Sequence, residues 1–398
     1  MKALVRTLAC AILAFPATTP AAEPSRPNII VVFIDDMGWG DFSCFGNKDA
    51  ETPNIDRLAK EGLAFEDFYV NSPICSPSRT ALTTGQFPQR WRISSYLSNR
   101  KHNKQRGMAQ WLDPKAPVLA RILKNSGYAT GHFGKWHMGG QRDVDDAPPI
   151  TAYGFDVSLT NFEGMGPKLL PLTLKPGDKK PGRIWRDAER LGKGYRWMQR
   201  SKITGGFVDA ALPFIDQAQK EGQPFYLNLW PDDVHPPLWP PVDQWAGDKR
   251  GLYLAVLEAM DRQLERLFDR VRNDEALRDN TLIIVCSDNG PEVGCGSPGP
   301  FRGSKATLFE AGVRSPLVVW GPGLIPADKA GTRNTTSTFS AIDLVPSLLN
   351  ITHTPIPDGI KFDGESLPDM LLGKSTASRK APIPFRRPPD RANFRHYQ

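Results

Sequence analysis

The chain has 398 residues, of which 40% are hydrophobic and 10% aromatic, and its formal net charge is +7. This length and apolar content predict one large α/β domain or two domains with a sizeable core, and they exclude a disordered chain. Most of the positive charge lies from Lys374 onward, where seven basic residues accompany one acidic residue. The charge therefore predicts a solvated basic end rather than a nucleic-acid-binding surface, and we expect no nucleic-acid partner.

Residues 1–22 have the pattern of a secretory signal. Lys2 and Arg6 precede a short apolar stretch, which is followed by small residues. The stretch is too short to span a bilayer as a helix, and Pro16 would interrupt a buried helix. We therefore expect an exported protein, periplasmic or secreted, that loses residues 1–22 together with Cys10. No later stretch is long and apolar enough to predict an integral membrane segment.

The rest of the chain alternates continuous apolar runs with amphipathic segments. The run from Ile29 to Ile34 is typical of a strand buried on both faces of a parallel sheet. Thr52, Pro53 and Gly62 supply the N-cap, first-turn and stop signals of a helix. Further helices are predicted within 116–126, 205–220 and 251–272, and further strands within 128–137, 225–230, 281–287 and 315–320. This alternation predicts an α/β fold with a mainly parallel sheet flanked by helices.

Residues 141–206 lack this alternation. They are rich in Gly, Pro, Lys and Arg and show little periodicity. We expect long surface loops there. They would form either one wall of a substrate pocket or a solvated insertion, and the sequence leaves both readings open.

Polar pairs follow two of the predicted strands, Asp35–Asp36 after the first and Asp288–Asn289 after a later one. Functional groups of open α/β sheets gather beyond the carboxyl ends of the strands. Three carboxylates and one amide oxygen would form a hard, all-oxygen site that suits Ca²⁺ or Mg²⁺ better than Zn²⁺. The alternative for each pair alone is a turn or a helix cap.

Three more motifs place cations and imidazoles near strand ends. Lys135 and His137 are two residues apart in "GKWHMGG", so on a strand they would share a face and suit an anionic ligand. His235 follows a predicted strand in "LWPDDVHPP", and Lys305 lies in a Gly-rich loop. Each of these residues alone is more often structural or solvated.

The stretch "NSPICSPSRTALTTGQ" contains a single thiol, Cys75. This cysteine could form half of a disulfide, fill the core, act as a nucleophile or serve as the precursor of another group. Four cysteines remain after loss of the signal, and they allow three complete disulfide pairings: Cys44, Cys75, Cys286 and Cys295.

Together these motifs resemble those of the type I, formylglycine-dependent sulfatases of the alkaline-phosphatase superfamily. "CSPSR" matches the C-x-P/A-x-R signature, and the other motifs appear in the order found in the family: "DDMGWGD", "GKWHMGG", "DDVHPP", "SDNG" and "RGSKATLFEAGVRSP". The resemblance runs from about Asn28 to about Leu367. It implies a large mixed, mainly parallel sheet flanked by helices, with residues 23–350 as the catalytic domain. Residues 351–398 would be a short C-terminal segment, the remnant of a smaller subdomain that relatives carry.

The resemblance also implies how the site works. Cys75 would be oxidised to Cα-formylglycine by a maturation enzyme, and one hydroxyl of the aldehyde hydrate would attack sulfur while the other drives release of sulfate. The resemblance implies that four residues hold Ca²⁺ or Mg²⁺: Asp35, Asp36, Asp288 and Asn289. Arg79 would steady the formylglycine and the metal-bound carboxylates, and Lys135 and Lys305 would bind sulfate. His137 would hold the non-attacking hydroxyl, and His235, with Lys305, would protonate the leaving oxygen.

The sequence therefore predicts a sulfatase that hydrolyses sulfate monoesters, with a sulfated carbohydrate as the expected substrate. Two other functions stay open at this stage. One is a phosphonate or phosphodiester hydrolase of the same superfamily, and the other is a non-catalytic protein that binds sulfated glycans.

Overall fold

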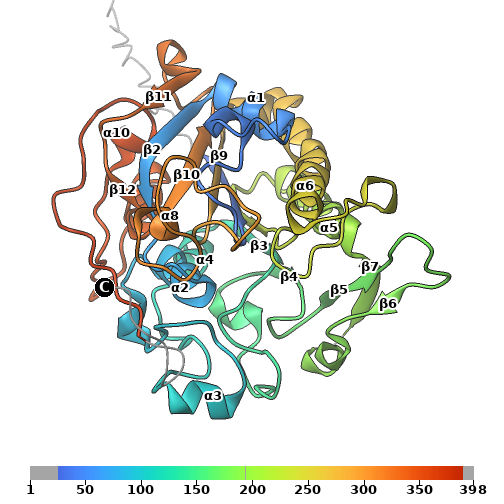
Figure 1. The fold of residues 1–398 in the computed structure, drawn as a ribbon. Helices are drawn as coiled ribbons and strands as arrows, with labels where there is room; N and C mark the ends of the chain where they lie inside the picture. Colours follow the sequence, from blue (N-terminus) through green and yellow to red (C-terminus); the bar gives the residue numbers. More distant parts are fainter. Residues whose placement is uncertain (1–25, 193, 389–398) are drawn as a thin grey trace, which may run out of the picture.

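A mixed β-sheet of twelve strands is the frame of the protein (Figure 1). The computed structural model describes residues 26–192 and 194–388. Ten strands follow the order β11-β2-β10-β9-β1-β8-β3-β4-β5-β6, while β12 pairs with β2 and β7 pairs with β5. In chain order the strands are β1 (Asn28–Ile34), β2 (Leu63–Tyr69), β3 (Ala129–Gly134), β4 (Val157–Thr160), β5 (Lys168–Thr173), β6 (Gly182–Arg183), β7 (Tyr195–Gln199), β8 (Phe225–Trp230), β9 (Thr281–Ser287), β10 (Arg314–Trp320), β11 (Thr332–Asn334) and β12 (Phe339–Ser340). The sheet confirms the predicted α/β fold.

The central strands β9, β1, β8 and β3 are parallel, and every residue of β1, β8 and β9 is buried. Adjacent side chains of a strand point to opposite faces. Accordingly, Ile29 and Val31 join one core cluster, and Ile30 and Val32 join the other. The continuous apolar runs in the sequence are therefore explained by a sheet that is covered on both faces.

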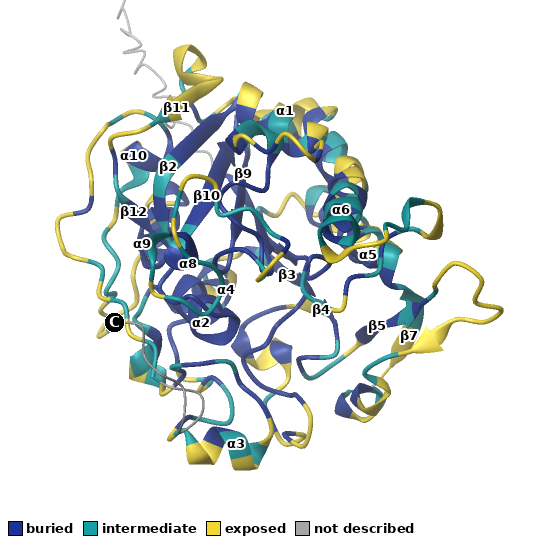
Figure 2. Cartoon of the chain, viewed as in Figure 1, coloured by how far each residue is buried: buried dark blue, intermediate teal, exposed yellow. Residues whose placement is uncertain are grey.

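Two groups of helices cover the two faces (Figures 1 and 2). Residues of α1, α5 and α6 belong to the cluster of Ile30, and residues of α2, α4, α9 and α10 belong to the cluster of Ile29. The helices are α1 (Pro53–Glu61), α2 (Cys75–Thr84), α3 (Arg100–Gln105), α4 (Leu119–Asn125), α5 (Ile203–Lys220), α6 (Lys249–Arg272), α7 (Glu275–Asp279), α8 (Glu310–Val313), α9 (Ala341–Ile351) and α10 (Pro368–Leu371). The helices predicted from sequence are present as α1, α4, α5 and α6. No helix among the described residues combines the length and the apolar composition needed to cross a membrane.

The prediction of loops throughout residues 141–206 is wrong, because the stretch contains β4, β5, β6 and β7. These strands extend the sheet beyond β3, with β4 parallel to β3 and β7 parallel to β5. β4, β6 and β7 are short and partly exposed, and β5 and β6 contain residues that are unfavourable in strands, such as Pro171 and Gly182. Pairing with an existing sheet edge, rather than a local pattern, determines their conformation.

The predicted strand through Lys135 and His137 is also too long. The strand β3 ends at Gly134, which has φ +117°. A Cβ atom at this position would lie 2.2 Å from the carbonyl oxygen of Trp230, so only glycine allows this close approach to the end of β8. The chain leaves the sheet there, and Lys135 and His137 follow in a turn.

Residues 351–388 lie along the main body of the protein. The helix α10 contributes to the same core cluster as α9, and the Arg379 guanidinium lies 3.5 Å from the Asp343 carboxylate. Farther along, Arg387 donates a hydrogen bond to the carbonyl of Ala306. The interpretation of 351–398 as a subdomain remnant stays a prediction. The predicted signal, residues 1–22 with Cys10, lies outside the described residues.

A buried carboxylate links α6 to the start of α1, and its removal should destabilise the fold. Asp261 accepts hydrogen bonds from the backbone N–H groups of Asn54 at 3.1 Å and Ile55 at 3.0 Å. We expect Asp261→Ala to lower the free energy of unfolding by about 1–3 kcal/mol, because both donors lose their acceptor and that of Ile55 is buried. Urea unfolding measures the change. The control Glu265→Ala removes an exposed carboxylate from the same helix and should cost less than about 1 kcal/mol; equal losses in the two variants would contradict the assignment.

Candidate active site

The two polar pairs lie at one edge of the sheet, because the central strands that precede them are parallel. Ile34, the last residue of β1, is in register with Ser287, the last residue of β9, so the two pairs that follow begin side by side. Lys135 comes directly after β3, and its backbone N–H donates to the carbonyl of Trp230 at the end of β8 at 2.9 Å. The topology thus gathers the polar residues that follow four strands.

Arg79 is the cation between the carboxylates of Asp35 and Asp288. It lies on α2 and is fully buried. Its Nη2 donates to Asp35 Oδ1 at 3.0 Å and to Asp288 Oδ2 at 2.7 Å, and its Nη1 donates to the Lys135 carbonyl at 3.0 Å. One side chain therefore ties α2 to the ends of β1, β9 and β3.

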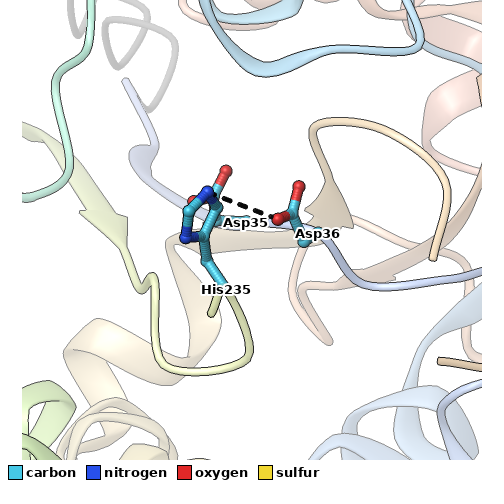
Figure 3. A group of neighbouring side chains, drawn as sticks. All are labelled: Asp35, Asp36 and His235. Carbon is cyan, nitrogen blue, oxygen red and sulfur yellow. Dashed lines mark ion pairs between the residues drawn. The ribbon is translucent and has the colours of Figure 1, made fainter. Parts of the chain in front are cut away.

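The Asp36 carboxylate lies close to three other polar side chains. Its backbone adopts a left-handed conformation with φ +61°. Lys305 Nζ donates to its Oδ2, and Asn289 Nδ2 donates to its Oδ1 at 2.9 Å. His235 Nε2 lies 3.5 Å from Asp36 Oδ2. Figure 3 shows the side chains of Asp35, Asp36 and His235 converging from two separate segments.

The residues at this edge could hold a hard divalent cation. Asn289 Oδ1 is buried and has no hydrogen-bond partner among the described residues, so it is available as a ligand. Together with the carboxylates of Asp35, Asp36 and Asp288 it forms the oxygen-rich set that Ca²⁺ and Mg²⁺ prefer. Ligand atoms of Asp35, Asp36 and His235 all lie within 4.8 Å of one another. Asp288 belongs to the wider set, because one of its oxygens is directed at Arg79.

The charges of the three carboxyl groups support this reading. Burial alone would raise the pKa of Asp35, but positive neighbours, led by Lys135, hold it well below its ordinary value. Burial raises the pKa of Asp36 despite Lys305. Burial and then Asp35 raise the pKa of Asp288 well above its ordinary value. The protein's own cations therefore balance these carboxylates unequally, and a divalent cation would favour ionisation of all three.

Lys135 and His137 face a fourth acidic residue, Glu163. Lys135 Nζ donates to Asp35 Oδ2 at 2.6 Å and lies 3.4 Å from Glu163 Oε2. His137 Nδ1 lies 3.2 Å from the same Oε2, while its Nε2 lies 3.0 Å from the carbonyl oxygen of Leu97. Burial lowers the pKa of His137 to about 4, although Glu163 opposes this effect.

Cys75 is the first residue of α2 and is buried, so the amino end of this ten-residue helix adds positive potential at its side chain. Burial raises the pKa of the thiol to about 11, with Lys135 acting in the opposite direction. At neutral pH the group is therefore a thiol, not the reactive thiolate. The four cysteines of the described residues are all free, so none of the possible disulfide pairings forms: Cys44, Cys75, Cys286 and Cys295.

Two glutamates of the site were not predicted. Glu163 contacts Lys135 and His137, and Glu292 Oε2 lies 3.8 Å from Lys305 Nζ. Neither residue stands in a recognisable motif. Glu163 is a single acid in a Gly-containing stretch that was expected to be a loop, and only the folded chain places it beside β3.

One cavity of about 620 Å³ lies away from the polar groups and is lined by Tyr128, Val157 and Phe214, among others. Tyr128 precedes β3 and Val157 begins β4. This cavity therefore lies at the amino edge of these parallel strands, opposite to the polar groups.

Comparison with known proteins gives a consistent result. A family model described as Sulfatase matches residues 27–354. N-acetylgalactosamine-6-sulfatase of Canis lupus familiaris is 32% identical over 373 residues, covering 89% of this chain and 68% of the relative. Arylsulfatase G of Mus musculus is 30% identical over 382 residues, covering 88% of this chain and 70% of the relative. The crystal structure of Ps i-CgsB in complex with k-i-k-neocarrahexaose is similar with a TM-score of 0.72 and 27% identity, covering 88% of this chain and 77% of that one.

The buried pairs of Arg79 should be important for stability. We expect Arg79→Met to lower the free energy of unfolding by about 3–5 kcal/mol, because it leaves two buried carboxylates without this cation. Chemical denaturation measures the loss. Arg90→Ala, which breaks an ion pair whose arginine side chain is 58% exposed, is the control and should cost at most about 1 kcal/mol. A similar small loss in both variants would mean that other cations replace Arg79.

Proposed function

The chain belongs to the sulfatase family of sulfuric ester hydrolases, and on this basis we propose that it hydrolyses sulfate esters of a sulfated carbohydrate with Cα-formylglycine made from Cys75. The observation that carries the proposal is the position of Cys75. It is buried at the first turn of α2, one helical turn before Arg79, among the charges of Lys135, Asp35 and Lys305. In a sulfatase this is the place of the nucleophile.

The state of the thiol supports its conversion. With a pKa of about 11, Cys75 would be a poor nucleophile as it stands. As a formylglycine hydrate, the residue would offer one hydroxyl to attack sulfur and a second to expel sulfate from the enzyme. The helix amino end and Arg79 would stabilise negative charge on this residue as it forms. A maturation enzyme is the implied partner.

We assign the cation site to Asp35, Asp36, Asp288 and Asn289, with Ca²⁺ as the expected ion and Mg²⁺ as the alternative. The free amide oxygen of Asn289 and the unequal balance of the carboxylates support this assignment. A bound divalent cation would supply Lewis acidity to a sulfate oxygen and to the attacking hydroxyl.

Lys135 and Lys305 would neutralise the remaining sulfate oxygens. Although burial disfavours charge on both amines, Asp35 raises the pKa of Lys135 well above its ordinary value, and Asp36 raises that of Lys305. Both side chains are therefore ammonium groups at neutral pH. They are fixed in place by carboxylates that the cation would share, so substrate binding needs little reorganisation.

The leaving alcohol needs a proton. The hydrogen bonds of His235 help to decide which residue donates it. Nδ1 of His235 lies 2.7 Å from the carbonyl oxygen of Pro236, so Nδ1 carries the hydrogen and Nε2 is an acceptor in the neutral ring. Burial and then Lys305 hold the pKa of His235 well below its ordinary value. We therefore assign the proton first to Lys305, with His235 sharing this role when it is an imidazolium.

A carbohydrate substrate is supported by the relatives, since one is named for N-acetylgalactosamine 6-sulfate chemistry and one structure contains a hexaose. The phosphonate or phosphodiester hydrolase is not favoured, because the curated relatives above are sulfatases. Export remains an expectation, based on the signal-like sequence pattern of residues 1–22.

The first test is mass spectrometry of the tryptic peptide Glu61–Arg79 from protein produced together with a maturation enzyme. We expect a species about 18 Da lighter than the thiol form, as conversion of Cys75 to formylglycine requires. That protein should turn over aryl and sugar sulfates in preference to a phosphonate monoester, and Cys75→Ala should not turn over any of them. An unmodified thiol with full sulfatase turnover would refute the nucleophile. Glycan binding without turnover by the converted protein would favour the binding function.

Removal of the cation should weaken both stability and activity. After EDTA treatment we expect a lower melting temperature, since the buried carboxylates lose their counter-charge. Ca²⁺ added back should restore it more fully than Mg²⁺. Asn289→Ala should reduce this response, whereas Asn334→Ala, in β11, should not. A melting temperature that ignores EDTA and added Ca²⁺ would contradict the assignment.

A further inference from the structure

Glu163 is held against the turn that follows β3 by its backbone as well as its side chain. Its carbonyl accepts hydrogen bonds from the N–H groups of Trp136 at 3.3 Å and His137 at 3.1 Å. Its own N–H donates to Asn161 Oδ1 at 2.8 Å. The side chain is only 9% exposed. The carboxyl group is therefore fixed beside Lys135 and His137.

The hydrogen bonds of His137 determine which of its nitrogens carries a hydrogen. Nε2 lies 3.0 Å from the Leu97 carbonyl oxygen, and a carbonyl can only accept, so Nε2 donates. In a neutral imidazole Nδ1 is then an acceptor. Nδ1 nevertheless lies 3.2 Å from Glu163 Oε2, which is also an acceptor when ionised. Two buried acceptors at this separation repel each other unless a proton lies between them.

We propose that Glu163 is a positioning residue for sulfate ester hydrolysis, and that Glu163 and His137 hold a single proton between Oε2 and Nδ1. The proposal rests on the proposed function and names a residue that the family motifs did not indicate in this sequence. Because Nε2 remains bound to Leu97, only Nδ1 is available for exchange. The pair can take up one further proton, with one hydrogen on Nδ1 and the other on the carboxyl group, and can return it afterwards.

Three cations lie around the pair. Lys135 is the nearest, with Nζ 3.4 Å from Oε2, while Arg79 and Lys168 act from farther away. Without a proton between them, Oε2 and Nδ1 would present lone pairs to each other, and the imidazole would not be held from this side.

Nuclear magnetic resonance tests the shared proton without turnover. The protein, with Cys75 unmodified, is labelled with ¹⁵N at its 6 histidines, and His137→Asn assigns the His137 signals. At neutral pH we expect protonated Nε2 and an Nδ1 signal between those of a protonated and an unprotonated nitrogen. In Glu163→Gln the amide can donate to Nδ1, so the signals should be those of a neutral ring with Nε2–H. Identical Nδ1 signals in the two proteins, or an unprotonated Nε2 in the wild type, would overturn the proposal.

Kinetics of the formylglycine-containing enzyme test whether the pair matters for the reaction. We expect Glu163→Gln to lower kcat about 100-fold, the usual scale of an impaired proton transfer, and to change KM less than about threefold. Glu189→Gln makes the same change in a glutamate that bonds the Trp197 indole, and it should leave both constants unchanged. An unchanged kcat in Glu163→Gln would contradict the role of the pair.

A double variant separates a role through His137 from a general loss of structure. If Glu163 acts through His137, Glu163→Gln should have little further effect on kcat in a His137→Asn background. Independent, multiplicative losses would overturn the positioning role. The two proposals can fail separately: absence of turnover on every sulfate ester would reject the proposed function, while the histidine signals would still decide whether Glu163 and His137 share a proton.

Discussion

The balance of buried charge at the ends of β1 and β9 is the constraint on which the rest of the site depends. Asp35 and Asp288 are wholly buried and share the Nη2 group of Arg79. The same guanidinium lies 5.3 Å from the Trp230 ring, which adds a cation–π contact inside the core. Buried ions are costly unless they are paired and hydrogen-bonded. The helix α2, with Cys75 at its start, must therefore occupy a single position relative to the strands.

Backbone strain accompanies this charge balance. Asp36, His137 and Ala306 adopt left-handed conformations, with φ of +61°, +52° and +70°, although none is a glycine. Such residues cost on the order of 1–3 kcal/mol each and persist where the surroundings fix them. Hydrogen bonds do so here, from His137 N to the Glu163 carbonyl at 3.1 Å and from Ala306 N to the Pro73 carbonyl at 2.7 Å. Packing and hydrogen bonds elsewhere thus hold these strained residues of the candidate site in place.

Segments distant in sequence support the site from outside the central sheet. The extension built by β4 to β7 includes the turn that carries Glu163, so a stretch expected to be loops contributes a buried carboxyl group. On the other side, Arg387 reaches the carbonyl of Ala306, the residue after Lys305. The loop that contains Lys305 and the segment that follows β3 are therefore both held by parts of the chain outside the recognisable motifs.

The sequence by itself determined the central strands, the main helices, the family and the residues that converge at the strand ends. These features depend on local patterns: apolar runs such as Ile29–Ile34, the cap and stop of α1, and short motifs such as that of Cys75 and Arg79. Only the tertiary structure decided where β3 ends, because the conformation of Gly134 is set by the Trp230 carbonyl on another strand. It also decided the outer strands and the place of Glu163, since sheet-edge pairing and a contact across 26 residues, from His137 to Glu163, have no local signature. Patterns within one element can be read along the chain, whereas contacts between elements exist only when the chain has folded.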